Sequence, residues 1–283
     1  MTSSTVDLSG LPRADQLSLV ALDLDGTLMC PYGLTPVSQR RLEAVSALQR
    51  AGLPVTFVTG RTEDYARPIA ERFGVTTPLV TYNGGRITCP TQHTILYQAS
   101  VAKPVVPQLL EWLDRSAHVV ALYLATPQGL RLVQNRSSGN EASDDYLFGT
   151  PREIVGPFSP LWNETLDYSK AIVLTRENQS AELVSLFADE VQVVRTHPDL
   201  YEILPGGVNK GSGVLRLCQH LGVDPAQVLT IGDQENDVAT FEAVGYSVAM
   251  GDSPDHVKQA ARWVTADFEH EGCALVLEAL LRK

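Results

Sequence analysis

The chain has 283 residues, of which 44% are hydrophobic, which is enough for two domains with sizeable cores and excludes a disordered protein. Its formal charge is −11, from 22 basic and 33 acidic residues, and no basic patch stands out, so we expect no nucleic-acid partner. A small phosphorylated substrate remains compatible, because a local site can be positive within a negative protein. We find no signal peptide and no stretch of ~18 apolar residues, and the four cysteines are widely spaced. These features predict a cytoplasmic protein with no membrane partner, and they leave its oligomeric state open.

The first part of the chain alternates predicted strands and helices. Short apolar runs, bounded by turn residues, are typical of buried strands. The helix after the first strand is predicted to begin with Thr35 as N-cap and Pro36 at its first position. Strands are predicted at 18–22, 54–58 and 79–82, and a second helix at about 63–73.

The middle of the chain, about residues 86–204, has a different pattern. Neighbouring strands joined by turns outnumber helices there, which favours an inserted α+β module. Pro205-Gly206-Gly207 then forms a natural hinge. The predicted elements are strands at 87–88, 94–97, 119–124, 130–133, 171–174, 191–194 and 201–204, helices at 105–113 and 181–188, and a loop at 135–146.

The last part returns to alternating helices and strands, which indicates βαβ units and a parallel sheet. We therefore predict an α/β fold: a Rossmann-like parallel-sheet core from residues 1–85 and 205–283, with an inserted α+β domain at 86–204. The predicted elements are helices at 210–221, 236–244, 255–261 and 273–281, and strands at 228–231, 246–250 and 263–265.

Three polar motifs directly follow predicted strands. They are Asp23-Leu24-Asp25-Gly26-Thr27, Thr59-Gly60-Arg61 and Gly232-Asp233-Gln234-Glu235-Asn236-Asp237. Ligands of open parallel sheets bind at the carboxyl ends of the strands. If the three strands are neighbours, four carboxylates, a hydroxyl and several glycine backbones meet there, as Mg²⁺ and a phosphoryl group require.

The two acidic motifs suggest different chemical roles. Asp23 can act as a nucleophile that forms an aspartyl-phosphate, and Asp25 can protonate a leaving oxygen and later activate water. Asp233 is best placed to bind Mg²⁺, which needs only two or three protein oxygens. Asp237 is either a ligand or a support, and Asn236 or Asp237 is also a candidate helix N-cap.

Three further groups fit a phosphate ligand. The Thr59 hydroxyl and the Gly60 N–H can donate to phosphate oxygens, although a strand-to-helix turn would use the same residues. Lys210 is predicted at the start of a helix, where a cation opposes the helix dipole. This unfavourable placement suggests that Lys210 neutralises Asp23 and the phosphoryl oxygens.

Taken together, these motifs resemble those of haloacid dehalogenase superfamily phosphatases, in the Cof-like subfamily with a large C2-type cap. Four family motifs occur in order, and the resemblance extends to Asn83-Gly84-Gly85 and Met250-Gly251-Asp252-Ser253-Pro254. It implies that 86–204 is a cap that selects the substrate. It also implies a Mg²⁺-dependent phosphatase that hydrolyses a small phosphorylated metabolite, a sugar phosphate or phosphoglycerate derivative, through an aspartyl-phosphate.

The resemblance also assigns residue roles. Asp23 would be the nucleophile and Asp25 the acid/base, with Thr59 and Lys210 also catalytic. Mg²⁺ would be held by the Asp23 side chain, the Asp25 carbonyl and Asp233, with Asp237 as a ligand or a support. Phosphate would be bound by the Leu24 N–H, Thr59, Gly60, Lys210 and Asn236.

Three alternatives differ in chemistry. A phosphomutase on the same scaffold would depend on a bisphosphate activator. A non-catalytic sugar-phosphate sensor would not need to keep Asp23, Asp25, Lys210 and Asp233. Relatives that cleave carbon–halogen or phosphonate bonds lack an aspartate two residues after the nucleophile, so Asp25 argues against that chemistry.

Overall fold

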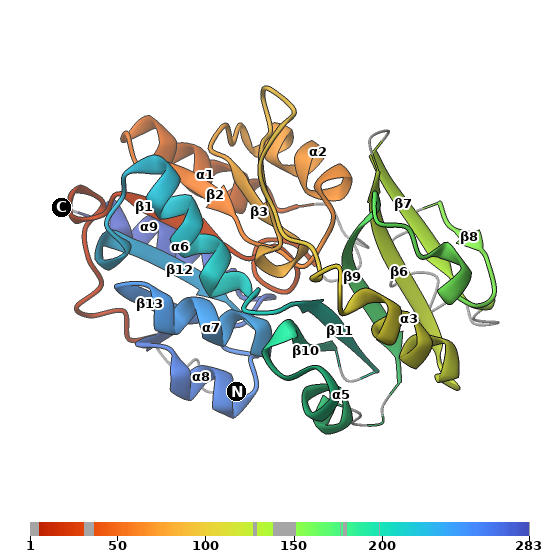
Figure 1. Ribbon diagram of the computed structural model, residues 1–283. Coiled ribbons are helices and arrows are strands. Elements are labelled where there is room, and N and C mark those ends of the chain that lie inside the picture. Colours follow the sequence, from red (N-terminus) through yellow and green to blue (C-terminus); the bar gives the residue numbers. More distant parts are fainter. Residues whose placement is uncertain are drawn as a thin grey trace. The chain divides into compact units, whose positions relative to one another are not determined.

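The chain forms two compact units, and five short parallel strands form the central sheet of the first unit, residues 1–97 and 210–283 (Figure 1). Each strand pairs in parallel with its neighbours, and β1 is buried along its whole length, as expected for a sheet covered on both faces. This confirms the Rossmann-like parallel-sheet core. In the order β14-β13-β12-β1-β2, the strands are Trp263–Val264, Tyr246–Ala249, Val228–Gly232, Leu19–Leu22 and Val55–Phe57.

Helices cover both faces of this sheet. Apolar residues of α1 (Gln39–Arg50), α2 (Glu63–Phe73) and α9 (Gly272–Leu280) form one buried cluster with the sheet. On the other face, α6 (Lys210–Leu221) packs through its own apolar residues. Two further α-helices of this unit, α7 (Glu235–Ala243) and α8 (Asp255–Ala260), pack together through Phe241 and Val257.

A small second sheet continues this unit beyond β2. β3 (Leu79–Thr81) pairs antiparallel with β4 (Arg86–Cys89), which lies next to β5 (Thr94–Gln98). A parallel bridge joins Val80 of β3 to Val58, directly after β2. The 3₁₀ turn Tyr82–Gly84, labelled η3, connects β3 to β4.

The computed structural model describes residues 6–30, 37–126, 129–137, 151–175, 177, 180–197 and 199–282. It divides the chain into two compact units. We call residues 1–97 with 210–283 the core domain, and residues 98–209 the inserted domain.

In the described residues of the inserted domain, six strands form one sheet, and two α-helices pack on one of its faces. α3 (Val106–Arg115) and α5 (Ser180–Phe187) share a buried apolar cluster with the sheet. Its strand pairs are antiparallel except β7 with β8, and this mixture of sheet and helices agrees with the predicted α+β type. In the order β10-β11-β9-β6-β7-β8, the strands are Val191–His197, Leu200–Pro205, Asp167–Leu174, Val119–Thr126, Gly129–Gln134 and Glu153–Ile154.

The two boundaries between the domains lie at 97/98 and 209/210, later in the chain than the expected boundaries at 85/86 and 204/205. The hairpin of β4 and β5 joins β3, which is bridged to the segment after β2, so these strands stay with the core domain. At the return, β11 continues to Pro205, and the Gly206 N–H donates to the Glu190 carbonyl at 3.0 Å. Backbone pairing therefore keeps these residues with the inserted domain.

Most predicted elements are confirmed to within a few residues, but some boundaries differ. The first helix begins at Gln39 and not at Pro36, because Ser38 is its N-cap and accepts the Arg41 N–H at 3.2 Å. Thr35 and Pro36 lie outside the described residues, as do 138–146 of the predicted loop. The two-residue strand β8 was not predicted. Among the described residues, no helix has the length and apolar character needed to cross a bilayer.

Candidate active site

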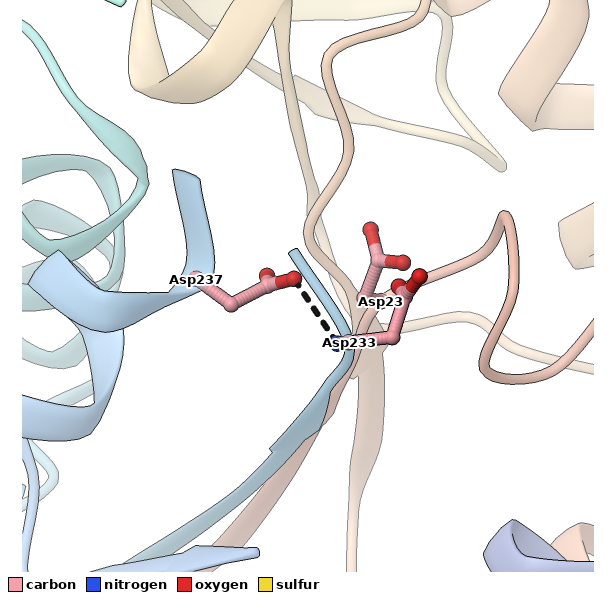
Figure 2. Close-up of side chains that lie close together, drawn as sticks. All are labelled: Asp23, Asp233 and Asp237. Carbon is pink, nitrogen blue, oxygen red and sulfur yellow. Dashed lines mark hydrogen bonds between the residues drawn. The ribbon is translucent and has the colours of Figure 1, made fainter. Parts of the chain in front are cut away.

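The polar motifs lie at the carboxyl ends of neighbouring strands, as expected. β1 lies between β12 and β2, and Leu22 at the end of β1 pairs with Ile231 of β12. Asp23 continues this ladder, since its N–H donates to the Ile231 carbonyl at 3.0 Å. Figure 2 shows Asp23 and Asp233 next to each other at these strand ends, with Asp237 directed toward them from α7.

Lys210, the first residue of α6, bonds to two of the carboxylates. Its Nζ lies 2.7 Å from Oδ1 of Asp23 and 2.7 Å from Oδ1 of Asp237. Only 1% of the Lys210 side chain is exposed, against 6% for Asp23 and 4% for Asp237. Charge-assisted hydrogen bonds are strong and hold both partners in place. Lys210 therefore offsets the charge of Asp23 and restricts its orientation.

The second oxygen of Asp237 supports the loop before α7. Oδ2 accepts the backbone N–H groups of Asp233 and Gln234, each at 3.1 Å, and the first of these bonds is dashed in Figure 2. Gln234 is the N-cap of α7 and forms a capping box with Asp237, so neither Asn236 nor Asp237 is the N-cap. Both oxygens of Asp237 thus accept bonds from donors within the chain, which favours a supporting role.

Burial raises the pKa of two carboxyl groups in this cluster, Asp23 and Asp233. The pKa of Asp23 is raised to about 7; the charge of Lys210 opposes this, and those of Asp237 and Asp25 add to it. Burial also raises the pKa of Asp233 well above its usual range, helped by the charge of Asp23. For Lys210, burial lowers the pKa, but the charges of Asp23 and Asp237 outweigh burial and raise it. The cluster therefore concentrates negative charge that a cation would stabilise.

The donor set fits a magnesium-type ion. Asp23, Asp233 and Asp237 each offer a buried carboxylate oxygen, and these oxygens lie within 4.8 Å of one another. Three carboxylates and the single ammonium of Lys210 leave two negative charges, which match a divalent cation. The Asp233 carboxylate is oriented by the Gln234 side-chain amide at 3.1 Å and contacts the Thr27 hydroxyl at 3.4 Å. Oxygen donors of this kind are those that Mg²⁺ prefers.

Gly26 lets the backbone after Asp25 pass close to the Asp233 side chain. Its φ is +80°, and a Cβ at this position would lie only 2.3 Å from Oδ2 of Asp233. A side chain here would therefore be strained and would displace Asp233.

Asp25 has a different environment from Asp23. Its side chain is 29% exposed, and its carboxylate accepts two hydrogen bonds from the Arg61 guanidinium. The Arg61 Cζ lies 3.7 Å from the centre of the Tyr65 ring, so the guanidinium is also stacked. Sequence reasoning assigned Arg61 no role, although its position directly after Thr59-Gly60 was a usable signal.

The candidate phosphate-binding groups lie on the same strand ends. The Thr59 Oγ1 accepts the Arg61 N–H at 3.1 Å, and a hydroxyl that accepts a bond can still donate its own hydrogen to a ligand. The loop that carries the Leu24 N–H is closed by the Leu24 carbonyl, which accepts the Leu28 N–H at 2.9 Å. Asn236 is the second residue of α7, and the amino-terminal turn of a helix favours an anion.

Comparison with known proteins identifies the family. A family described as haloacid dehalogenase-like hydrolases matches residues 20–277. The chain belongs to this haloacid dehalogenase-like family. One relative, the 5-amino-6-(5-phospho-D-ribitylamino)uracil phosphatase YitU of Bacillus subtilis, is 27% identical over 267 residues, which cover 92% of this chain and 96% of that protein.

Solved structures of haloacid dehalogenase-like proteins share the fold. A hydrolase of the family from B. subtilis superposes with a TM-score of 0.80 at 22% identity, over 94% of this chain and all of that one (100%). A sugar phosphatase of haloacid dehalogenase subclass IIB superposes with a TM-score of 0.79 at 19% identity, over 93% and 98% of the two chains. At these identities the similarity shows the fold alone, and it confirms the predicted α/β architecture.

Proposed function

We propose that this chain is a Mg²⁺-dependent phosphatase that hydrolyses a small phosphorylated metabolite through an aspartyl-phosphate on Asp23. The observation that carries the proposal is the buried Asp23 at the end of β1, bonded to Lys210 and close to Asp233. The chain is a hydrolase of the haloacid dehalogenase-like family, and relatives named as phosphatases support phosphatase activity on phosphorylated small molecules. The metal, the intermediate and the substrate class are our proposals.

The proposed reaction has two steps. In the first, an Asp23 oxygen attacks phosphorus in line, and the bond from phosphorus to the leaving oxygen breaks as Asp25 gives that oxygen a proton. In the second, Asp25 accepts a proton from a water molecule whose oxygen attacks phosphorus. The bond between phosphorus and Asp23 then breaks, which releases inorganic phosphate and restores the carboxylate.

The remaining site residues bind and orient the phosphoryl group. Its oxygens would accept bonds from Lys210 and from the donors Leu24 N–H, Thr59, Gly60 N–H and Asn236. The side chains of Asp23 and Asp233 and the carbonyl of Asp25 would hold Mg²⁺, with Asp237 as support. When bound, Mg²⁺ supplies positive charge that stabilises the phosphoryl oxygens.

We further propose that the inserted domain selects the leaving group of a sugar phosphate or phosphoglycerate derivative. A screen of phosphorylated metabolites with Mg²⁺, scored by released phosphate, tests the proposed reaction and the proposed substrate class. The screen should include a phosphorylated ribitylaminouracil, because the relative YitU is named for that substrate. Release of phosphate from one metabolite class supports the proposal, and no release from any compound contradicts it. Dependence on a bisphosphate activator would instead favour a phosphomutase.

Activity should require Mg²⁺ and should disappear when a chelator is in excess. Ca²⁺ should bind the same carboxylates but inhibit, because its larger and looser coordination shell would misplace Asp23. Phosphate release is measured in EDTA, after Mg²⁺ is restored, and with Ca²⁺ in competition. Full activity in excess EDTA would rule out the metal assignment.

Asp25→Asn should separate the two steps. The variant keeps the nucleophile but loses the acid and the base, and such groups contribute typically ~10²–10⁴-fold. An aryl phosphate needs little protonation of its leaving group, so phosphate should still transfer to Asp23 while hydrolysis of the intermediate is slow. We expect a burst of aryl alcohol and an acid-stable phosphoenzyme that is cleaved by hydroxylamine. A variant that turns over both alkyl and aryl phosphates at the wild-type rate would disprove the role of Asp25.

A further inference from the structure

The turn after β3 has an unusual backbone. Tyr82, Asn83 and Gly84 have φ values of 54°, 51° and 95°, so two successive residues with side chains adopt the left-handed region. This region is unfavourable for residues other than glycine, although asparagine tolerates it better than most. Two backbone bonds join the turn to the loop at 59–61: the Tyr82 N–H donates to Arg61 O and the Asn83 N–H to Thr59 O, each at 3.0 Å. Strained backbone of this kind is concentrated at functional sites.

The strained turn directs the Asn83 side chain toward α7. Asn83 is 1% exposed, and its Oδ1 accepts a hydrogen bond from Nδ2 of Asn236 at 3.0 Å. The Asn236 amide carries two hydrogens on Nδ2, so a second hydrogen can reach a phosphate oxygen while the first is held. The two residues are 153 positions apart in the chain and meet only in the folded core domain.

Gly60 leaves the space that the Asn83 amide occupies. A Cβ at position 60 would lie 2.9 Å from Nδ2 and 3.0 Å from Oδ1 of Asn83. Side-chain carbon atoms do not approach amides so closely, so any residue other than glycine would displace the Asn83 side chain. The loop at 59–61, the turn at 82–84 and the first turn of α7 therefore meet at this one buried amide.

We propose that Asn83 is a positioning residue of the phosphate site. Its amide holds the Asn236 amide and sets the spacing between the start of α7 and the loop of Thr59 and Gly60. Donors from these two segments then approach one phosphate group with little remaining freedom, which lowers the entropic cost of binding. This inference rests on the proposed function, which assigns Thr59, Gly60 and Asn236 to phosphate binding.

The test is a double-mutant cycle on the binding of inorganic phosphate in the presence of Mg²⁺. Asn83→Gly removes the amide but keeps the backbone, because glycine adopts φ near 51° without strain. We expect Asn83→Gly and Asn236→Ala each to weaken phosphate binding about 10-fold in titration calorimetry, as the loss of one ordered donor contact predicts. Because Asn83 acts through Asn236, the double variant should bind no more weakly than Asn236→Ala alone.

His93→Gly is the matched control. His93 also has a positive φ, 53°, but it is exposed between β4 and β5, so this variant should bind phosphate as wild type does. Gly60→Ala provides a second route, because its Cβ should displace the Asn83 amide and give the same 10-fold loss, again absent when Asn236 is alanine. Gly60→Ala replaces Asn83→Gly in the test if the Asn83→Gly protein does not fold.

The outcomes distinguish this inference from the proposed function. The positioning role would be overturned if the losses of phosphate affinity in the two single variants were additive, or if a folded Asn83→Gly protein bound phosphate as wild type does. The proposed function would still stand in either case, provided that the wild type releases phosphate from a metabolite. If the variants show the expected cycle but the wild type releases phosphate from no metabolite, the Asn83 role is supported and only the proposed reaction is contradicted. A wild-type protein that binds no phosphate overturns both.

Discussion

Asp23→Asn should abolish turnover, with a loss on the order of 10⁶-fold if the residue is the nucleophile, as for removal of other catalytic nucleophiles. The amide cannot form the phosphoenzyme, so no label should transfer from a labelled substrate to the protein. In wild type, trapped label should map to Asp23. A steady wild-type rate in Asp23→Asn, or label on another residue, would refute the mechanism.

This variant should remain folded, which makes the loss of activity interpretable. The amide oxygen can still accept the Lys210 bond, and Lys210 keeps its second bond to Asp237. Burial and neighbouring acids raise the pKa of Asp23 to about 7, so its ionised form is unfavourable in the folded metal-free protein. Such a group lowers stability as pH rises from about 4 toward 7, and the amide removes this effect. We therefore expect no decrease in the melting temperature of the metal-free protein at pH 7.

Asp255→Asn is the control for this substitution. The Asp255 side chain is 93% exposed, and its carboxylate lies 3.7 Å from Lys258 in a solvent-exposed pair. Such pairs contribute little to stability. The control should therefore keep both wild-type turnover and the wild-type melting temperature.

Lys210→Met should lower both the free energy of unfolding and activity. Methionine has a similar length but no charge, so Asp23 and Asp237 would lose the ammonium that bonds to both. Removing one partner of a buried ion pair costs about 3–5 kcal/mol, because the remaining charge is buried without compensation. Denaturant unfolding of the metal-free protein measures this loss, and phosphate release measures the loss of charge stabilisation at the phosphoryl group.

Two further variants test the cause of that loss. Lys258→Met removes a partly exposed lysine in α8 and should change stability by no more than about 0.5 kcal/mol. Lys210→Met combined with Asp237→Asn removes one of the two unpaired charges and should recover part of the lost stability. A single Lys210→Met variant as stable as wild type would show that the buried charges are compensated in another way.

Local patterns in the sequence predicted the elements and the positions of the chemistry. The apolar runs before Asp23, Thr59 and Asp233 are strands, and α6 spans the predicted residues from Lys210 to Leu221. β1 and β12 are buried along their whole length, and this burial favours runs of mostly apolar residues, which can be recognised from four or five consecutive positions. The three polar motifs likewise indicated one common crevice, because ligands of a parallel sheet bind where its strands end.

Some local features were not decided by the local pattern. Thr35-Pro36 is a strong start signal, yet the helix begins after Ser38, whose hydroxyl accepts the Arg41 N–H. A helix that begins after Thr35 and one that begins after Ser38 are both compatible with the apolar residues that follow, and the sequence does not show which start is preferred. The hairpin of β4 and β5 reads as part of an insertion, but backbone hydrogen bonds attach it to β3 in the core domain.

The sequence by itself determined the fold class, the helix and strand pattern and the acidic residues that follow the strands, because short-range periodicity and turn chemistry encode them. Only the tertiary structure decided how the side chains are paired. It engages both oxygens of Asp237, joins Arg61 to Asp25, and brings Asn83 to Asn236 across 153 positions. Such pairings depend on the packing of distant segments, which has no local signature in the chain.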